Sequence, residues 1–415
     1  MSNSNFSHWQ SQIESIYRAN STRIYASLVR MLRDFDLAEE ATQEAFSIAV
    51  DCWRQDGIPD NPTAWLISTG RFKAIDTLRR QGRLDALTPD IAQHVLELAA
   101  ANRQKSNETI EDDRLRLIFA CCHPAIDPAV QVPLTLREIC GLSTEQIAAA
   151  FMVNPSAMAQ RIVRGKAKIR DAGIPISIPD EDDFHERLDS VLAVVYLVFN
   201  EGYSASSGEQ VTRTELSAEA IRLCRLLVQL APEAETIGLL ALMLLHESRR
   251  TARTNQIGDI VLLEDQDRSC WDAAMISEGL ALVERALGMD RVGVYSLQAA
   301  IAAVHASATA ADLTDWPQIL ALYSALYSID SSPVVELNRA VAVAMVHGAD
   351  AGLQIVNAIL DRGELSAFHL AYAAQADLLR RLGRTEEARH AYHTALSLAQ
   401  QAPERRFLAK RLDEL

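Results

Sequence analysis

Turn-forming and aromatic residues are scarce in this chain, which holds 17 glycines, 13 prolines and 6% aromatic side chains in 415 residues. Strands joined by tight turns need Gly and Pro at the turns, whereas the Ala and Leu that dominate here have high helix propensity. A disordered chain is excluded too, because 49% of the residues are hydrophobic. We therefore predict an all-α protein, and its length predicts two to four compact units.

Cysteine is also scarce, and its spacing fits neither a disulfide framework nor a zinc site. The run Cys121 to His123 is the one cluster of metal-ligand types, but adjacent helical residues point about 100° apart and no second ligand cluster lies nearby. We expect reduced, buried thiols, no metal and no cofactor. The six cysteines are Cys52, Cys121, Cys122, Cys140, Cys224 and Cys270.

Long uncharged apolar runs are missing as well. No window reaches the roughly 18 residues that a spanning helix needs, and the start MSNSNFSHWQ has no charged segment followed by an apolar one. The sequence thus predicts no membrane partner and a cytoplasmic location.

What the chain does have is an uneven distribution of its formal net charge of −15. Residues 1–175 carry 20 basic and 21 acidic side chains, so nearly all of the acidic excess lies in residues 176–415. The first part can approach a polyanion, whereas the acidic second part is unsuited to one.

A basic segment at residues 153–170 has five cations and no acidic side chain. Upstream of it, Ser143 and Gln146 form a capping box and predict a short helix to about residue 151. After a three-residue turn, Asn154 and Pro155 are suited to begin a second helix. Helix, short turn and helix in this order indicate a helix-turn-helix motif.

The second helix of this motif has distinct inner and outer faces. Met158, Ile162, Gly165 and Ile169 recur at helical spacing and are expected inside. The outer face predicts base reading in the major groove from its first turns, and phosphate attraction from its later cations. The alternative is a solvated cationic face on an ordinary surface helix. The residues expected to contact DNA are Ser156, Ala157, Gln160, Arg161, Arg164, Lys166 and Lys168.

Two segments of the chain resemble one protein family. The stretch DDRLRLIFACCHPAIDPAVQVPLTLREICGLSTEQIAAAFMVNPSAMAQRIVRGKAKIRDAG resembles the promoter-binding region four of bacterial sigma factors of the extracytoplasmic-function type. DFDLAEEATQEAFSIAVDCW, followed by NPTAWLISTGRFKAIDTLRRQGR, resembles region two of the same family, in the same order. Two such segments are far more specific than a helix-turn-helix alone.

In the first of the region-two segments, an apolar stripe of Leu37, Ala41, Ala45, Ile48 and Cys52 is opposed by a polar face. Taken alone, this pattern describes a well-capped surface helix. The resemblance implies that the polar face docks on the β′ clamp helices of core RNA polymerase. It assigns that role to Asp36, Glu39, Glu40, Gln43 and Glu44.

The next segment predicts a helix capped by Asn61 and Pro62 that carries several cations. The resemblance implies that this helix grips the opened non-template strand, with an unstacked base in a pocket. Phe72 stands where many relatives have Asn, which puts the base contact in doubt. We expect Phe72 to pack in the core, with base stacking as the alternative. The cations expected to contact DNA are Arg71, Lys73, Arg79 and Arg80.

These segments predict an order of parts along the chain. Region two occupies residues 1–83, a linker with one helix 84–113, and region four 114–173. A proline-bearing acidic linker at 174–183 precedes a helical C-terminal domain at 184–415. The long extension resembles that of one subgroup of these sigma factors.

The C-terminal domain ends in a pattern of the tetratricopeptide type near residues 333–400. Its clearer copy has Ala376, Gly383, Ala388, Tyr392 and Ala395 in the small and aromatic positions, and a weaker copy lies about 35 residues earlier, with Gly348 and Leu360 in the matching places. Such repeats offer a face for a protein or peptide partner.

Polar residues of this domain raise the question of catalysis. They lack a nucleophile–base pair, a phosphate loop and metal spacing, so we expect a structural use and no enzyme. The residues concerned are Asn200, Glu201, Tyr203, Asp265, Asp267, Arg268 and Asp272.

We expect a sigma factor that binds core RNA polymerase at the β′ clamp helices and β flap, and promoter DNA. Its C-terminal domain is interpreted as a regulatory or partner-binding module. The rival hypotheses are a helix-turn-helix regulator without polymerase docking and a tetratricopeptide scaffold without initiation activity. An enzymatic C-terminal domain ranks last.

Overall fold

The structure is a computed structural model that describes residues 3–80, 107–151, 153–203, 214–255 and 257–415. Throughout these ranges the regular elements are helices, and one isolated bridge joins Thr254 to Ile260. This confirms the all-α prediction. The chain forms two compact units, Met1–Val194 and Val195–Leu415.

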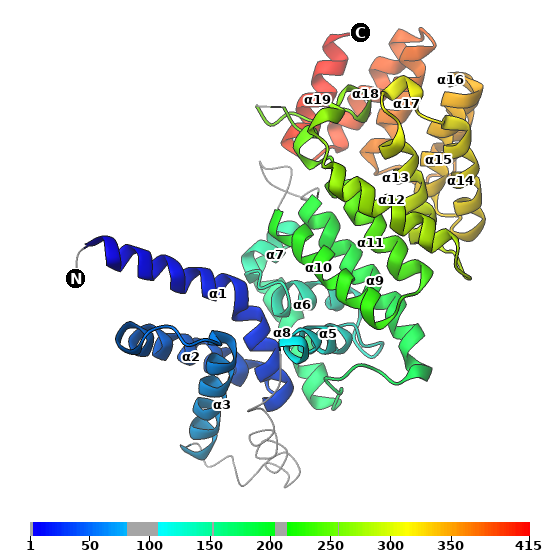
Figure 1. Cartoon of the computed structure of the whole chain (residues 1–415). Coiled ribbons are helices and arrows are strands. Elements are labelled where there is room, and N and C mark those ends of the chain that lie inside the picture. The colour runs from blue at the N-terminus through cyan, green and yellow to red at the C-terminus, as the bar shows by residue number, and fades with distance from the viewer. Residues whose placement is uncertain (1–2, 81–106, 152, 204–213, 256) are drawn as a thin grey trace. The chain divides into compact units, whose positions relative to one another are not determined.

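The first unit begins with three mutually packed helices, α1 (Asn3–Leu32), α2 (Phe35–Asp56) and α3 (Pro62–Arg80) (Figure 1). Asp34 caps α2 and Asn61 caps α3 by accepting backbone N–H groups at 3.0 Å. Gly70 allows α3 to lie close to its neighbours, since a Cβ there would stand 3.0 Å from the carbonyl oxygen of Ala41.

The buried side of α2 differs from the stripe expected from the sequence. Ala41 and Ala45 are buried, but Leu37, Ile48 and Cys52 are only partly so. The buried positions also include Ala38, Thr42, Ala49 and Trp53. Because α1 and α3 both pack on α2, the buried sector is wider than one stripe and centred on a different line of residues.

Four more helices complete the sigma-like part of the first unit: α5 (Asn107–Cys121), α6 (Pro128–Glu138), α7 (Thr144–Ala150) and α8 (Pro155–Asp171). Helix α5 begins seven residues before the expected end of the linker, whose residues 84–106 lie outside the described part. Asp113, the last residue of the expected linker, is therefore helical and lies in the core of the first unit. It is 1% exposed, and its carboxylate binds Ser27 and Arg30 of α1 at 2.9 and 2.6 Å.

Helix α9 (Glu181–Tyr203) begins inside the expected linker at 174–183 and continues across the boundary between the units. Its first turns belong to the first unit. Phe184 packs on Phe119 of α5 with ring centroids 5.5 Å apart, and Arg187 donates to the Phe119 carbonyl at 2.7 Å.

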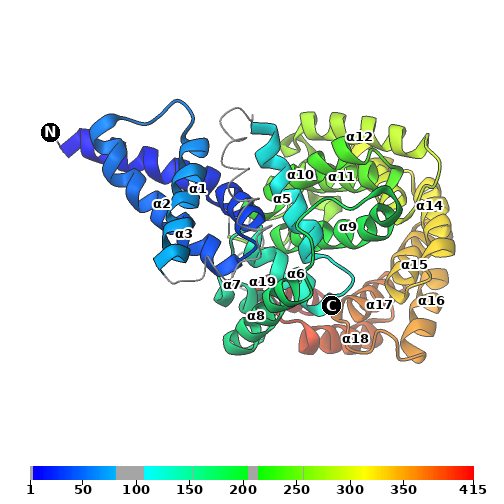
Figure 2. The same ribbon diagram turned by 90° about the horizontal axis from the view of Figure 1, so that it is seen from below.

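In the second unit, α11 (Ala234–Glu247) is the central helix. It packs against α10 (Thr214–Leu230), α12 (Ala273–Leu287) and α13 (Val294–Ser307) (Figure 2). Nearly every residue of α11 is buried, which explains its apolar sequence. Short 3-10 turns lie between α11 and α12: η2 (Arg250–Ala252), η3 (Leu263–Asp265) and η4 (Arg268–Cys270).

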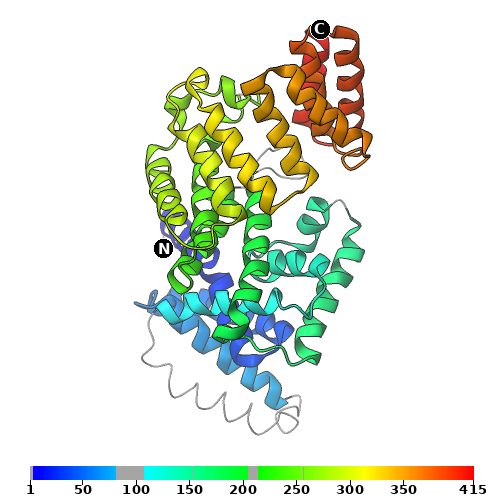
Figure 3. The same cartoon turned by 90° about the vertical axis from the view of Figure 1, so that its right-hand side faces the viewer.

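The remaining helices follow one another as packed neighbours (Figure 3). After η5 (Ala311–Leu313) they are α14 (Trp316–Ile329), α15 (Pro333–His347), α16 (Ala349–Asp361), α17 (His369–Arg381), α18 (Thr385–Leu398) and α19 (Ala402–Asp413). The turns within the pairs α15/α16 and α17/α18 place Gly348 and Gly383 at φ of 96° and 73°. The two expected repeat copies therefore correspond to two helix pairs, and the small and aromatic positions Ala376, Ala388, Tyr392 and Ala395 are buried.

Candidate nucleic-acid and polymerase-binding surfaces

The helix-turn-helix has the caps that its sequence predicts. Gln146 accepts from the Ser143 backbone at 2.8 Å, and Ser143 Oγ accepts in return at 3.2 Å. Asn154 Oδ1 accepts from the backbone of Ser156 at 2.9 Å and begins α8. All four residues expected on the inner face of α8 are buried: Met158, Ile162, Gly165 and Ile169.

The outer face of α8 presents most of the predicted DNA-binding residues to solvent. Arg161 is partly exposed, and none of Arg161, Arg164 and Lys168 forms an ion pair with another described residue. Cations without an acidic partner are available to phosphates without first breaking a contact. The fully exposed members of the set are Ser156, Ala157, Gln160, Arg164 and Lys168.

Lys166 lies apart from this outer face. Its side chain is 15% exposed, and its Nζ stands 3.4 Å from Asp36 and 3.3 Å from Glu138. The ammonium also lies 5.7 Å from the ring of Phe35. A phosphate contact from Lys166 stays a prediction, and it requires these pairs to open.

The cations of α3 are less uniform than the sequence suggested. Arg79 is exposed and Lys73 partly so, while the side chain of Arg80 lies outside the described part. Arg71 is only 6% exposed, and burial lowers its pKa. In this conformation Arg71 is therefore not on the surface where a DNA-binding cation was expected.

Phe72 is 61% exposed, so the expectation that it packs in the core is wrong. Adjacent helical positions differ by about 100°, and the buried Ala74 and Gly70 set the inner face of α3. That register turns Arg71 inward and Phe72 outward, with the Arg71 guanidinium 5.0 Å from the Phe72 ring.

The acidic face of α2 lies at the surface of the first unit. Asp36, Glu40 and Gln43 are exposed, and Glu39 and Glu44 are partly exposed. Two of them are engaged, because the Glu39 carboxylate lies 3.0 Å from Arg137 of α6 and Asp36 lies 3.4 Å from Lys166 of α8.

Two large hydrophobic residues that the sequence did not single out lie beside this face. Tyr17 of α1 is 49% exposed and Val50 of α2 is 38% exposed, and both line a shallow depression together with Gln43. The signal in the sequence was an aromatic or branched residue at a solvent position of a helix. Aromatic residues such as Tyr17 are enriched at protein interfaces.

A buried polar cluster joins the region-two helices to the region-four helices, and the sequence did not reveal it. Tyr25 of α1 donates to Glu138 of α6, and Ser27 and Arg30 of α1 bind Asp113 of α5. Burial raises the pKa of Glu138, although the charge of Lys166 opposes this, and burial followed by the Glu138 charge raises the pKa of Tyr25 well above its usual range. Polar junctions of this kind are typical of interfaces between modules that also separate.

Three of the polar residues singled out in the second unit have structural uses. Asp267 caps η4 and Asp272 caps α12 through backbone N–H groups at 2.9 Å. Arg268 donates to the carbonyls of His305 and Ala308 at 2.7 and 2.6 Å, which fixes the end of α13.

The cysteines are free thiols, but they are not all buried as expected. Cys121, Cys122 and Cys224 are buried, and burial raises the pKa of Cys122 to about 12. Cys270 is exposed, because it lies in the short turn η4. Across the described ranges, no cluster of three or more metal-ligand side chains occurs, and no helix is long and apolar enough to cross a membrane.

Comparison with family models matches three parts of the chain. Residues 16–84 match Sigma-70 region 2, residues 116–169 match Sigma-70, region 4, and residues 187–287 match a family of unknown function, DUF6596.

Relatives with known names point the same way. The probable ECF RNA polymerase sigma factor SigI of Mycobacterium tuberculosis is 26% identical over 40% of this chain and 57% of its own length. The ECF RNA polymerase sigma factor SigK of Mycobacterium ulcerans is 26% identical over 38% of this chain and 79% of its own length. No solved structure matches the chain.

One relative extends over both units: an uncharacterized protein of Rhizobium meliloti (strain 1021) is 46% identical over 94% of this chain and 92% of its own length. The named sigma factors match only a part of the chain, whereas this relative shares the C-terminal extension as well. The two sigma regions occur in the family's order, and each coincides with helices that begin at the expected caps. The chain therefore belongs to the extracytoplasmic-function sigma factors of the sigma-70 family, which act in transcription initiation, and it carries a long helical C-terminal extension.

Proposed function

We propose that this sigma factor divides its contacts among three surfaces. The outer face of α2 docks on the β′ clamp helices of core RNA polymerase, α3 holds the opened strand, and α8 recognises the promoter duplex. Polymerase performs the chemistry, so we assign no catalytic residue.

The outer face of α8 is the observation that carries the proposal. Its N-terminal turns expose Ser156, Ala157 and Gln160, which leaves them free to meet base edges in the major groove. A good bidentate pair from Gln160 or Arg161 would discriminate against a wrong base by about 1–3 kcal/mol. Arg164 and Lys168 lie further along, where the phosphates would be.

The extension is proposed to be a fused regulatory or partner-binding module that replaces or supplements a separate anti-sigma protein. The successive pairs α15/α16 and α17/α18 support this idea, because stacked pairs of the tetratricopeptide kind bind protein or peptide partners.

Transcription in vitro tests the proposal. Core polymerase is mixed with a library of promoter fragments, with and without the full-length protein, and the transcripts are sequenced. Enrichment of one two-part promoter motif supports the assignment, whereas the absence of any protein-dependent transcript contradicts it.

Arg161→Ala separates DNA recognition from docking. We expect it to reduce transcription from the enriched promoter without weakening polymerase binding, and to lower the magnitude of the salt slope of DNA binding by about 0.9 if Arg161 meets a phosphate. Reduced affinity for polymerase would contradict the assignment of α8 to DNA.

A further inference from the structure

The second unit contains a cavity of about 500 Å³. The contacts with DNA and polymerase proposed above do not involve it. It lies among α11, α13, α14, α15 and the η4 turn. Its walls are largely aromatic and aliphatic, and its size is within the range of small-molecule sites. The main apolar lining residues are Tyr196, Leu242, Ile301, Tyr323 and Leu326.

One cation of the lining has no partner. Arg249 follows α11 and lines the cavity, and its side chain makes no hydrogen bond or ion pair with any other residue that the structure describes. Its neighbours differ: Arg250 pairs with Glu247, and Arg253 lies 3.6 Å from the Tyr203 ring and donates to the Tyr203 carbonyl.

The acidic lining residue, Asp330, forms no ion pair with Arg249. Asp330 accepts from the backbone N–H of Ser332 at 3.1 Å and from its hydroxyl at 3.2 Å. The lining thus has one cation and one carboxylate that do not pair with each other, and the guanidinium N–H donors of Arg249 are left without an acceptor among the described residues.

A second donor in the lining also has no partner. Trp271 is only 7% exposed, and its buried indole N–H has no acceptor. A backbone hydrogen bond of 2.8 Å from Asp272 to the Ser248 carbonyl brings the chain segments of Trp271 and Arg249 together. Since a buried unsatisfied donor costs about 1–3 kcal/mol, an acceptor bound here would be stabilised by satisfying it.

Two imidazoles of the lining respond to the same positive charge. Burial, and then Arg249 with its neighbours, lowers the pKa of His246 to about 3 and that of His305 to about 4. Both rings are neutral near pH 7, so they leave Arg249 as the cation that faces the cavity.

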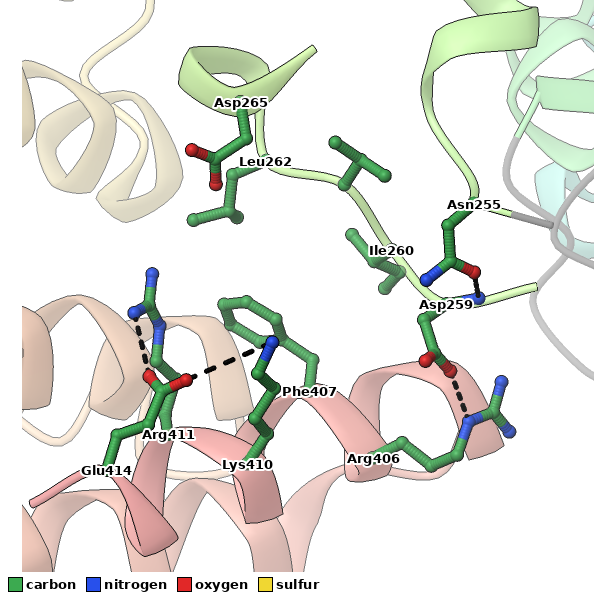
Figure 4. Close-up of a pocket in the computed structure, with 11 residues that line it drawn as sticks. Asn255, Asp259, Ile260, Leu262, Asp265, Arg406, Phe407, Lys410, Arg411 and Glu414 are labelled. Atoms are coloured by element: carbon green, nitrogen blue, oxygen red, sulfur yellow. Dashed lines mark hydrogen bonds and ion pairs between the residues drawn. The ribbon is translucent and has the colours of Figure 1, made fainter. Parts of the chain in front are cut away.

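The smaller cavity in Figure 4, of about 260 Å³, provides a contrast within the same unit. It lies between the segment that includes Asp259 and Asp265 and helix α19, and each of its cations pairs with a carboxylate. Arg406 lies 2.6 Å from Asp259, and Glu414 pairs with Arg411 at 3.1 Å and with Lys410 at 3.9 Å. All three cations of that cavity are therefore engaged in ion pairs, unlike Arg249 in the larger one.

We propose that the larger cavity binds a small organic anion with an aromatic or aliphatic body. Its carboxylate accepts from Arg249 and from the Trp271 indole, and its apolar part lies against Tyr196, Tyr323 and Leu326. The site belongs to the second unit alone and does not depend on the promoter or polymerase contacts proposed above.

Calorimetric titration of the full-length protein tests the site. The probes are phenylacetate and indole-3-acetate, with phenylacetamide as the neutral match. We expect saturable binding of one acid per chain and at least about tenfold weaker binding of the amide, because hydrogen bonds to a charged group are the stronger ones.

Variants identify the groups that hold the anion. Arg249→Gln should weaken acid binding about 10- to 100-fold and Trp271→Phe about fivefold. Arg285→Gln, an exposed position of α12 away from the cavity, is the matched control and should bind like the wild type. Ala302→Trp, which fills the cavity, should abolish binding while the thermal unfolding midpoint shows that the chain is folded.

Several results would overturn the proposal. They are no saturable binding of either acid up to about 10 mM, equal affinity for acid and amide, or an unchanged affinity in Arg249→Gln. Because binding is measured without DNA or polymerase, failure here would not be confused with failure of the transcription assay.

Discussion

At the scale of single residues, two adjacent positions of α3 have the opposite exposure to the one expected from the sequence. Arg71 was expected to meet DNA and Phe72 to pack inside, yet the exposed fractions are 6% and 61%. An exposed aromatic ring on a helix that resembles the strand-binding part of region two is suited to stack an unpaired base.

Phe72→Ala should therefore impair promoter opening. Stacking of a base on an aromatic side chain is worth about 1–3 kcal/mol, so we expect about a tenfold loss of transcription from duplex promoter. A template with a pre-opened bubble should restore most of it, and Phe72→Trp should be close to wild type. Equal losses on duplex and bubble templates would argue against stacking. Since the ring is exposed, stability should change by no more than about 0.5 kcal/mol.

His246 predicts how the second unit responds to acid. Its pKa is lowered to about 3 by burial, by Arg249 and Arg253, and by His305. In the unfolded chain its pKa is about 6.5, so the unfolded state binds a proton first as the pH falls. The stability that depends on a neutral His246 is therefore complete above about pH 6.5 and is lost progressively toward pH 3.

We expect the free energy that protects α11 amides from hydrogen exchange to fall by about 1–2 kcal/mol more between pH 7 and pH 5 in the wild type than in His246→Gln. Other titrating groups act equally in both proteins and cancel in the comparison. If the protection free energy depends on pH in the same way in the two proteins, His246 takes up its proton in the folded state as readily as in the unfolded chain.

At the scale of elements, α13 depends on a cap from another helix. Its own N-cap, Gly293, has no side chain, and Glu235 of α11 takes its place. The Glu235 carboxylate accepts backbone N–H groups of Gly293, Tyr295 and Ser296 at 3.0, 2.8 and 3.1 Å. No capping motif in the local sequence predicts this, because the residue lies about 60 positions upstream.

Glu235→Ala should lower the stability of the second unit by about 2 kcal/mol, since it leaves several buried donors at a helix start without an acceptor. Hydrogen exchange of the first turn of α13 should report the loss. Glu284→Ala, an exposed change on α12, is the control and should leave that turn unaffected. Similar exchange in both variants would mean that α13 does not need this cap.

The ion pair between α6 and α2 holds a residue of the proposed polymerase-docking face. Arg137 holds Glu39 at 3.0 Å, and Glu39 belongs to the face that we propose docks on the β′ clamp helices. Arg137→Ala should raise the affinity for core polymerase up to about fivefold, because exposed pairs are worth about 0.2–1 kcal/mol. Arg164→Ala, on the exposed face of α8, should leave that affinity unchanged. If Arg137→Ala binds core polymerase with the same or a lower affinity, Arg137 does not compete with polymerase for Glu39.

At the scale of the whole molecule, the boundary between the units lies inside α9 rather than in the acidic linker. A chain cut at residue 178 loses Phe184 and Arg187, which cover Phe119 of α5. We expect faster hydrogen exchange in α5 for that chain than for one ending at residue 203. If the two chains exchange alike, α9 does not support the region-four helices.

The choice between these two truncation points decides what a transcription assay of a truncated chain reports. Loss of activity in the chain cut at residue 178 would report damage to the first unit, whereas the chain ending at residue 203 tests the extension itself. Increased activity of the longer fragment would identify the extension as a brake, and decreased activity would identify it as a support.

The sequence by itself determined the all-helical class, the caps of the helix-turn-helix and the inner face of α8, because these depend on residues no more than four positions apart. Ser143 with Gln146, Asn154 with Pro155, and Met158 with Ile162 are all such local pairs. It also determined the family, since two motifs in fixed order need no knowledge of their contacts.

Only the tertiary structure decided what distant residues do to one another. Lys166 pairs with Asp36, Glu235 caps α13, and Arg249 is left without a partner in a cavity. Each outcome depends on which helices pack together and at which rotation. Helical periodicity leaves that rotation open, because an amphipathic helix has a buried side but its sequence does not name the neighbour that covers it.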